Sequence, residues 1–221
     1  MFLFSFLAFA LKDGSSSNNE NSKMPNEEAL PNKIALNAYS FNKQLRTDSM
    51  DLFDLLDYCF ELGFDGADLT GYYFPGYPVP PSDEYIYQVK KKAFEVGMHI
   101  CGTGVKNDLC NPNPTVRMAE KQLIKNWIIV ANKLGAPALR IFQGKPMPEN
   151  YSWDEVATWV AADIRECADF AKKHGVVLEI QNHNTFLKNA QDVISLMELI
   201  NHEWVGLMLD IGSYRTENPY H

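Results

Sequence analysis

Clusters of basic residues and long apolar runs are both missing from this sequence. Its 221 residues include 20 Lys plus Arg against 28 Asp plus Glu, a formal net charge of −8, and no stretch concentrates the basic side chains. Nucleic acid and anionic lipid surfaces are therefore not expected as partners. No apolar run reaches the roughly 18 to 20 residues that a membrane-spanning helix requires, so we predict no membrane span.

Paired cysteines and complete nucleotide-binding motifs are missing too. The four cysteines never occur as C-x-x-C, and a chain of this length needs no disulfides, so we expect reduced, mostly packed thiols. Gly102-Thr103-Gly104 resembles the start of a dinucleotide fingerprint, but Val105, Lys106 and Asn107 do not complete it. The chain does have 46% hydrophobic and 22% charged residues, the profile of a globular domain with a sizeable core.

The composition changes sharply near residue 32. Met1–Leu11 is apolar and as long as a signal-peptide core, and Ala8–Ala10 resembles a cleavage site, but no basic residues precede it. Lys12–Asn32 is rich in Ser, Asn, Glu and Pro and buries too little surface to order. We interpret residues 1–32 as an apolar start plus a disordered linker, and residues 33–221 as the folded domain. An export signal and an inert tail both remain open, and with them an exported (periplasmic) or a cytoplasmic location.

A strand-and-helix unit repeats along the folded domain. After a short strand at Ile34–Leu36, apolar residues recur at the spacing of one helical face, at Leu52, Leu55, Leu56, Cys59 and Phe60. Glycines then close successive helices at intervals of 34 to 40 residues, at Gly63, Gly97, Gly135 and Gly175. Helix starts are predicted at the capping residues Thr47–Ser49, Ser82, Asn113, Ser152 and Asn189. A sixth strand is predicted over Trp204–Asp210.

Nearly continuous apolar strands joined by helices favour parallel pairing, in either an open doubly wound sheet or a (β/α)₈ barrel. In both architectures ligands bind at the carboxyl ends of the strands. The polar residues predicted there are Tyr39, Ser40, Asp68, Thr70, Lys106, Asn107, Asp108, Gln143, Glu179, Gln181, Asn182, His183, Asn184, Asp210 and Ser213.

Two carboxylates stand out in this set. Glu179 interrupts the apolar run Val176–Ile180, where a carboxylate is costly to bury without a partner or a cation, and Asp210 ends the next strand. We expect the two at the same height on adjacent strands, where they repel unless a positive charge lies between them. Two oxygen ligands suit Mn²⁺ or Mg²⁺, and a His ligand widens the choice to Zn²⁺ or Co²⁺. The alternative is that each carboxylate caps a turn or pairs with Lys or Arg.

Four further residues are candidates for substrate binding: His183, Asn182, Lys106 and Gln143. His183 is placed to contact a sugar hydroxyl, a carbonyl or the metal, and Lys106 is suited to a phosphate or an enolate oxygen, although single loop residues of these types often have no such role. The aromatic loop Tyr72–Pro78 is suited to stack on a sugar ring, or else covers the rim of the barrel.

Several motifs together resemble a known family. LEIQNHNTF around Glu179 and GLMLDIGSY around Asp210, preceded by FDGADLTGYYFPGY and CGTGVKND, are similar to the sugar phosphate isomerase/epimerase group of xylose isomerase-like TIM barrels. The resemblance runs from about Lys33 to the end. It implies a (β/α)₈ barrel in which Glu, Asp, His and Glu on strands five to eight hold a divalent ion and the two Glu shuttle a proton. Carried onto this chain, Glu179 is a ligand and the acid/base, and Asp210 is a ligand.

The resemblance is incomplete at the carboxyl end. Only 11 residues follow Asp210, whereas a full barrel has roughly 250 residues, so we predict a barrel truncated to about six βα units. We expect a fragment, a chain completed by a partner, or a degenerate copy, with at most weak metal binding and no turnover by itself. The predicted reaction is isomerisation or epimerisation of a sugar or sugar phosphate. A dehydratase and a non-catalytic exported carbohydrate-binding barrel remain alternatives, and a homo-oligomer is left open.

Overall fold

The computed structural model describes residues 6–7, 33–144, 147–183 and 186–213. Its strands are β1 Phe6–Leu7, β2 Ala35–Asn37, β3 Gly66–Thr70, β4 His99–Gly104, β5 Ala138–Ile141, β6 Val177–Gln181 and β7 Val205–Leu209. Its α-helices are α1 Asn42–Arg46, α2 Leu52–Glu61, α3 Asp83–Glu95, α4 Pro114–Leu134, α5 Trp153–Lys173 and α6 Ala190–Ile200, with short 3₁₀ turns at Ala38–Phe41 and Gly71–Tyr73.

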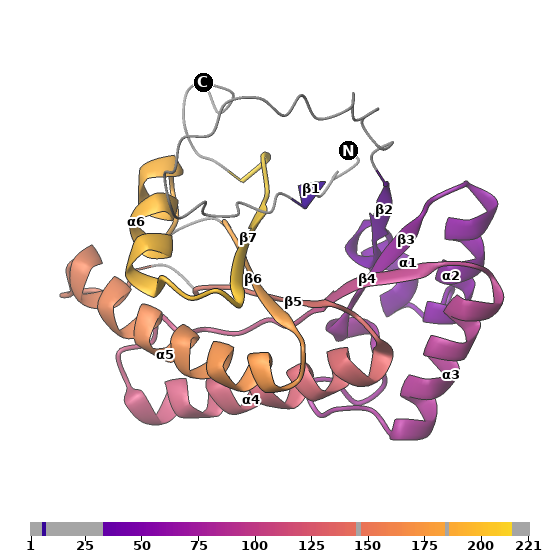
Figure 1. The fold of residues 1–221 in the computed structure, drawn as a ribbon, viewed down its shortest axis with the longest axis horizontal. Coiled ribbons are helices and arrows are strands. Elements are labelled where there is room, and N and C mark those ends of the chain that lie inside the picture. The colour runs from indigo at the N-terminus through magenta and orange to yellow at the C-terminus, as the bar shows by residue number, and fades with distance from the viewer. Residues whose placement is uncertain (1–5, 8–32, 145–146, 184–185, 214–221) are drawn as a thin grey trace, which may run out of the picture.

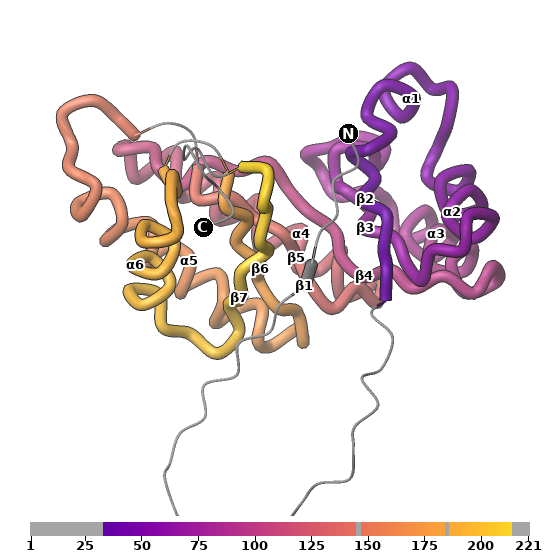
Figure 2. Tube along the Cα trace, turned by 90° about the horizontal axis from the view of Figure 1, so that it is seen from above, coloured from indigo at the N-terminus to yellow at the C-terminus, as the bar shows by residue number. Residues whose placement is uncertain are grey.

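The sheet has the consecutive strand order of a barrel. β2 to β7 are all parallel and follow one another in chain order, whereas a doubly wound sheet reverses its order at a switch point. The sheet curves into a half-barrel with the helices on its outer side, and β2 and β7 lie at the two ends of the arc (Figures 1 and 2). The predicted truncated barrel of six βα units is therefore confirmed.

The outer edge of β7 carries one further short pairing. Phe6 pairs with Leu209 and Leu7 with Met208 in antiparallel register, so β1 adds a seventh strand beside β7. This pairing falls within the segment 1–32 that we expected to be a start and linker. The rest of that segment lies outside the described residues, as does the candidate cleavage site Ala8–Ala10.

Most helix boundaries follow the predicted caps. The side chains of Ser82, Asn113, Ser152 and Asn189 each accept a backbone N–H at the start of α3, α4, α5 and α6. The predicted start at Thr47–Ser49 is wrong, because Asp51 caps α2. Its carboxylate accepts the N–H of Asp54, whose own carboxylate accepts the N–H of Asp51. This reciprocal pair satisfies two otherwise unpaired donors, while Thr47 ends α1.

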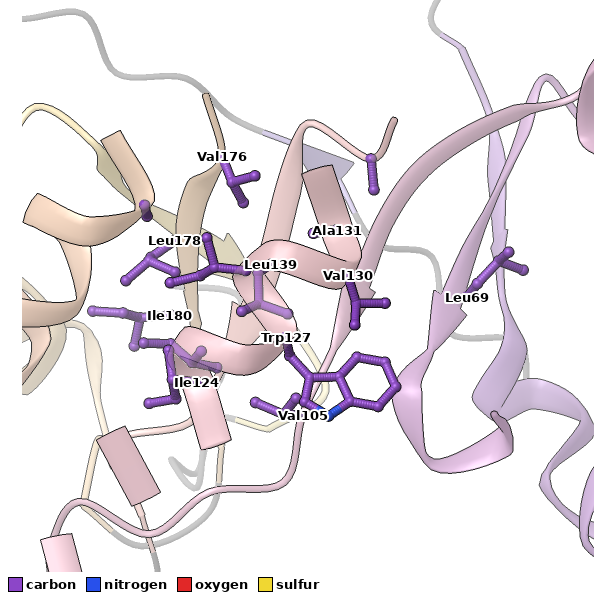
Figure 3. Close-up of a cluster of buried hydrophobic side chains, with 14 of the residues drawn as sticks. Leu69, Val105, Ile124, Trp127, Val130, Ala131, Leu139, Val176, Leu178 and Ile180 are labelled. Carbon is purple, nitrogen blue, oxygen red and sulfur yellow. The ribbon is translucent and has the colours of Figure 1, made fainter. Parts of the chain in front are cut away.

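Alternate side chains of the strands face opposite sides of the sheet. Leu139 of β5 and Leu178 and Ile180 of β6 are fully buried in the apolar layer under the helices (Figure 3). The residues between them, Arg140 and Glu179, consequently face the inside of the half-barrel. The same alternation that builds the core therefore also sets which polar groups line the interior.

Trp127 of α4 ties this core to the aromatic loop that follows β3. Its side chain is fully buried (Figure 3), and its ring centroid lies 5.5 Å from those of both Phe74 and Tyr77. Its indole N–H donates a hydrogen bond of 2.9 Å to the carbonyl of Pro78. The loop at Tyr72–Pro78 is thus anchored to α4.

Within the described residues no helix is both long and apolar enough to span a membrane. The four cysteines all have free thiols, as predicted.

Replacing Trp127 with Ala is expected to lower the free energy of unfolding by about 3 to 5 kcal/mol, because a large buried ring leaves a cavity. Urea unfolding followed by circular dichroism measures the loss. Phe94→Ala is the control, since Phe94 is 85% exposed and its truncation should change the free energy little. Equal losses in the two variants would contradict this account of the core.

Candidate functional site

Three buried charged residues face the interior of the half-barrel. Asp68 lies on β3, Arg140 on β5 and Glu179 on β6, and they are only 5%, 4% and 4% exposed. Arg140 and Glu179 are direct register partners on neighbouring strands. Asp68 pairs in register with Gly102 of the intervening strand β4. The fold therefore gathers one guanidinium and two carboxylates on the inner face of the sheet.

Asp68 is held at one carboxylate oxygen only. Its Oδ2 accepts a hydrogen bond of 2.6 Å from the side-chain amide of Asn37 on β2, whereas its buried Oδ1 has no hydrogen-bond partner among the described residues. Burial raises the pKa of Asp68, and the nearby charge of Arg140 opposes the rise. The sequence had indicated Asp68 only as a polar residue near a strand end.

Two aromatic rings and the backbone of a glycine surround the guanidinium of Arg140. Its guanidinium carbon lies 5.1 Å from the ring centroid of Phe142 and 5.9 Å from that of Tyr72. A Cβ added at Gly104 would lie only 2.6 to 2.9 Å from the guanidinium atoms, so the guanidinium rests on backbone that has no side chain. This residue was missed, although an arginine within the apolar run of β5 is as unusual as the glutamate in β6.

The hydrogen bonds of Arg140 are few and long. Nη1 lies 3.4 Å from the hydroxyl of Tyr72 and Nη2 lies 3.5 Å from that of Thr70, while the buried Nε has no partner among the described residues. No described carboxylate lies within the 4.0 Å of an ion pair with it. The guanidinium is therefore buried with most of its donor capacity unused.

Glu179 is buried and accepts no hydrogen bond from any described residue. Burial raises the pKa of its carboxyl to about 7; the negative charge of Asp68 adds to this rise and the positive charge of Arg140 opposes it. At neutral pH this carboxyl is thus poised between its protonated and ionised forms, the condition that suits a group which both takes up and returns a proton.

Asp210 is held in a turn after β7. Its Oδ2 accepts hydrogen bonds from the amide of Gln181 at 2.8 Å and the hydroxyl of Ser213 at 2.7 Å, and its Oδ1 accepts the N–H of Gly212 at 3.0 Å. Asn182 fixes the backbone of Asp210, accepting its N–H at 2.6 Å and donating to its carbonyl at 2.9 Å. Both polar atoms of the Asn182 amide are consequently engaged with Asp210.

The expectation that the two predicted ligands lie at the same height of the sheet is wrong. In the parallel register, Glu179 is opposite Gly206, and Gln181 is opposite Met208, which precedes Asp210 by two residues. The reason is that β7 continues past the level of Glu179 before its turn begins, a stagger that neither strand's sequence reveals. Asp210 therefore lies nearer the carboxyl end than Glu179 does.

The described residues contain no group of three or more His, Cys, Asp or Glu side chains able to hold a metal ion. Each of the two predicted ligands nevertheless keeps acceptor capacity of the kind that a cation uses. The buried carboxylate of Glu179 accepts no hydrogen bond from any residue that the structure describes. Asp210 accepts three hydrogen bonds, which leaves about one lone-pair direction of a carboxylate's four.

The four predicted substrate-binding residues are placed differently. Gln143 is fully buried and its amide donates to the carbonyl of His183 at 2.9 Å, and the ring of His183 packs edge-on against Phe142 at 5.3 Å. These two residues therefore lie together beside the ring that covers Arg140. Lys106 is exposed, with its N–H bonded to the hydroxyl of Tyr77, and Asn182 is engaged with Asp210. Asn184 lies outside the described residues.

Comparison with known proteins agrees with this architecture. A family model described as a xylose isomerase-like TIM barrel matches residues 56–218. A search of curated proteins finds no match. A solved D-psicose 3-epimerase from Clostridium cellulolyticum H10, crystallised with D-tagatose, superposes with a TM-score of 0.65 at 20% identity, covering 76% of this chain and 62% of the epimerase.

Two other solved structures are similar. The probable 3-DHS dehydratase AsbF of Bacillus anthracis has a TM-score of 0.62 at 19% identity, covering 80% of this chain and 62% of the dehydratase. An L-ribulose 3-epimerase has a TM-score of 0.61 at 16% identity, covering 80% of this chain and 60% of the epimerase. Identities this low establish a shared fold. The chain spans about three fifths of the length of these proteins.

The raised pKa of Glu179 predicts a pH-dependent stability in the metal-free protein. Because the folded-state pKa is about 7 and the ordinary value is 4.5, the protonated form favours folding. The contribution is full below about pH 4.5 and is lost by the time the pH passes about 7, with a size of about 3 kcal/mol. Glu179→Gln should remove this part of the slope.

Urea unfolding at pH 5 and pH 8, with a chelator present, measures the difference. Glu198→Gln is the matched control, because Glu198 is exposed on α6 and should leave the slope as it is. An unchanged slope in Glu179→Gln would show that this carboxyl titrates near its ordinary value.

Proposed function

The chain belongs to the xylose isomerase-like TIM barrel family. We propose that it functions as a divalent-metal-dependent isomerase or epimerase of a sugar or sugar phosphate, with Glu179 as the proton-transfer group. One observation carries the proposal. A carboxylate that is 4% exposed and accepts no hydrogen bond from any described residue lies on the inner face of β6. Burying such a group without a partner is costly, and a catalytic role accounts for the cost.

The proposed chemistry is proton abstraction next to a carbonyl. Glu179 takes the proton from the carbon beside the carbonyl carbon. The electron pair of the broken C–H bond forms a carbon–carbon double bond, and the carbonyl oxygen gains the negative charge of an enediolate. Return of the proton from Glu179 to the former carbonyl carbon gives an isomer, provided that the hydroxyl proton on the first carbon moves to the former carbonyl oxygen, so that the carbonyl forms at the first carbon. Protonation of the first carbon on its opposite face by a second acid gives an epimer. No oxidant or reductant is consumed.

Glu179 and Asp210 would hold the divalent ion, which we propose to be Mn²⁺ or Mg²⁺, with Zn²⁺ or Co²⁺ as other candidates. When bound, the ion supplies a positive charge that stabilises the sugar oxygens in their negatively charged form. Gln181 and Asn182 orient Asp210 through their hydrogen bonds to its carboxylate and its backbone. Two carboxylates do not complete such a site, so further ligands from outside the described residues belong to the proposal.

Substrate contacts are proposed for His183, Asn182, Gln143 and Lys106. His183 and Gln143 have the strongest support, because they lie together next to Phe142. Ketoses are the natural first substrates, since D-psicose, D-tagatose and L-ribulose appear in the names of the similar epimerase structures. The dehydratase among the similar structures keeps elimination of water as a second candidate reaction.

Deuterium exchange tests the proton transfer. The protein is incubated in D₂O with each ketose and Mn²⁺ or Mg²⁺, and mass spectrometry measures deuterium at the carbon next to the carbonyl. Exchange at one carbon needs only removal and return of a proton by Glu179, so we expect it even though the chain by itself is not expected to complete turnover. A chelator should abolish the exchange, and an excess of metal should restore it. Glu179→Gln should lower the exchange rate by at least about 100-fold, the usual contribution of general acid–base catalysis, and Glu198→Gln should not alter it.

Other results would point elsewhere. Loss of water from the substrate without isotope exchange in recovered sugar would favour the dehydratase. Sugar binding that survives the chelator, with no exchange by the wild type for any ketose, would favour a non-catalytic carbohydrate-binding barrel.

A further inference from the structure

We propose that Arg140 is a substrate-binding residue whose guanidinium donates hydrogen bonds to the sugar oxygen that becomes negatively charged when Glu179 removes the proton. This inference rests on the proposed function. It assigns a role to a residue that sequence motifs did not single out, and it specifies the ligand chemistry at this point as a carbonyl or hydroxyl oxygen of the sugar.

The unused hydrogen-bonding capacity of Arg140 is the first argument. A guanidinium offers five N–H donors, yet within the described part of the chain this one makes two hydrogen bonds, of 3.4 and 3.5 Å, to Tyr72 and Thr70. Its buried Nε has no partner among those residues. By contrast, the Nε of Arg117 forms an ion pair of 2.8 Å with Asp163. Because a buried charge is costly unless it is satisfied, the few contacts of Arg140 indicate that a further acceptor belongs beside it.

Its position is the second argument. Arg140 and Glu179 are register partners on β5 and β6, and neighbouring strands lie about 4.8 Å apart. Both side chains therefore start from the same level and the same face of the sheet. The guanidinium extends from this level over Gly104 of β4 towards Thr70 and Tyr72. We propose that a sugar lying along the inner face, with its C–H bond at Glu179, places its carbonyl oxygen at the guanidinium. Donors fixed beside the place where charge develops stabilise the transition state more than the ground state.

The third argument is that the guanidinium is fixed before any substrate binds. The ring of Phe142, the residue after β5, lies near it, the ring of Tyr72 approaches it from the turn after β3, and the backbone of Gly104 supports it. Gly104 ends the Gly-Thr-Gly segment that resembles the start of a dinucleotide fingerprint. Its lack of a side chain is instead required by the close approach of Arg140.

The charges nearby favour a neutral oxygen over a phosphate. Asp68 and Glu179 both affect the electrostatics around this guanidinium, so a phosphate here would meet two carboxyl groups as well as one cation. An oxygen that is neutral in the substrate and gains charge only during the reaction avoids this repulsion.

Two variants on β4 and one on β5 test the proposal in the deuterium-exchange assay, with D-psicose, D-tagatose and L-ribulose as probes. Arg140→Met removes the donors. Gly104→Ala keeps the guanidinium and its charge but displaces it, because the new methyl group would overlap it. Gly102→Ala is the matched control: its Cβ has its nearest atoms at 3.6 Å or more, an ordinary contact.

We expect Arg140→Met and Gly104→Ala to lower kcat by about 100-fold or more, the usual effect of losing one donor to a developing oxyanion, with a smaller change in KM. Gly102→Ala should behave as the wild type. Urea unfolding accompanies each variant, and if Arg140→Met does not fold, Gly104→Ala decides the question.

The outcomes separate the inference from the proposed function. If the wild type exchanges deuterium and the folded Arg140→Met or Gly104→Ala protein keeps the wild-type kcat, the proposed role of Arg140 is wrong. The proposed role of Glu179 is then unaffected. If the wild type exchanges no deuterium with any of the three ketoses, the proposed function fails and the inference fails with it.

Discussion

The burial of three charged side chains inside an apolar sheet is the constraint on which the site depends. Asp68, Arg140 and Glu179 are each about 95% buried on the inner face of β3, β5 and β6. Burial raises the pKa of both carboxyls, and the charge of Asp68 raises that of Glu179 further, while the positive charge of Arg140 opposes the rise at each. A sheet selected only for stability would carry apolar residues at these positions. Their burial is the observation that supports the proposed catalytic use of this interior.

The outer side of the sheet makes this interior possible. Capped helices cover it, and residues such as Leu139 and Leu178 supply the apolar burial that stabilises the strands. Because side chains alternate along a strand, each apolar residue that faces a helix places its neighbour inside the half-barrel. The hydrogen bond from Trp127 to the carbonyl of Pro78 fixes the loop whose Tyr72 ring lies near the Arg140 guanidinium. The packing of the helices and the geometry of the site are consequently linked.

Sequence reasoning found the carboxylates but misjudged their relation. Glu179 was recognisable because it interrupts an apolar strand, and by the same criterion Arg140 could have been found in β5. The pairing of Asp51 with Asp54 was equally readable as a capping pair. The stagger of Asp210 relative to Glu179 was not readable, because the register between two strands is set by the packing of both and not by either alone. The engagement of Asn182 with Asp210 depends on the same stagger.

The amino-acid sequence by itself determined the repeating units, most of the helix caps, the closing glycines and the parallel pairing of the strands, because these follow from local periodicity and from the chemistry of single turns. Periodicity left a barrel and a doubly wound sheet both open, and the barrel was expected from the family resemblance. Tertiary structure alone decided that Arg140 and Glu179 are register partners, that Gly104 makes room for the Arg140 guanidinium, and that burial together with the charge of Asp68 raises the pKa of Glu179. These relations join residues 36 to 111 positions apart. Only the curvature and register of the folded sheet bring such residues together, since no local pattern encodes the distance between them.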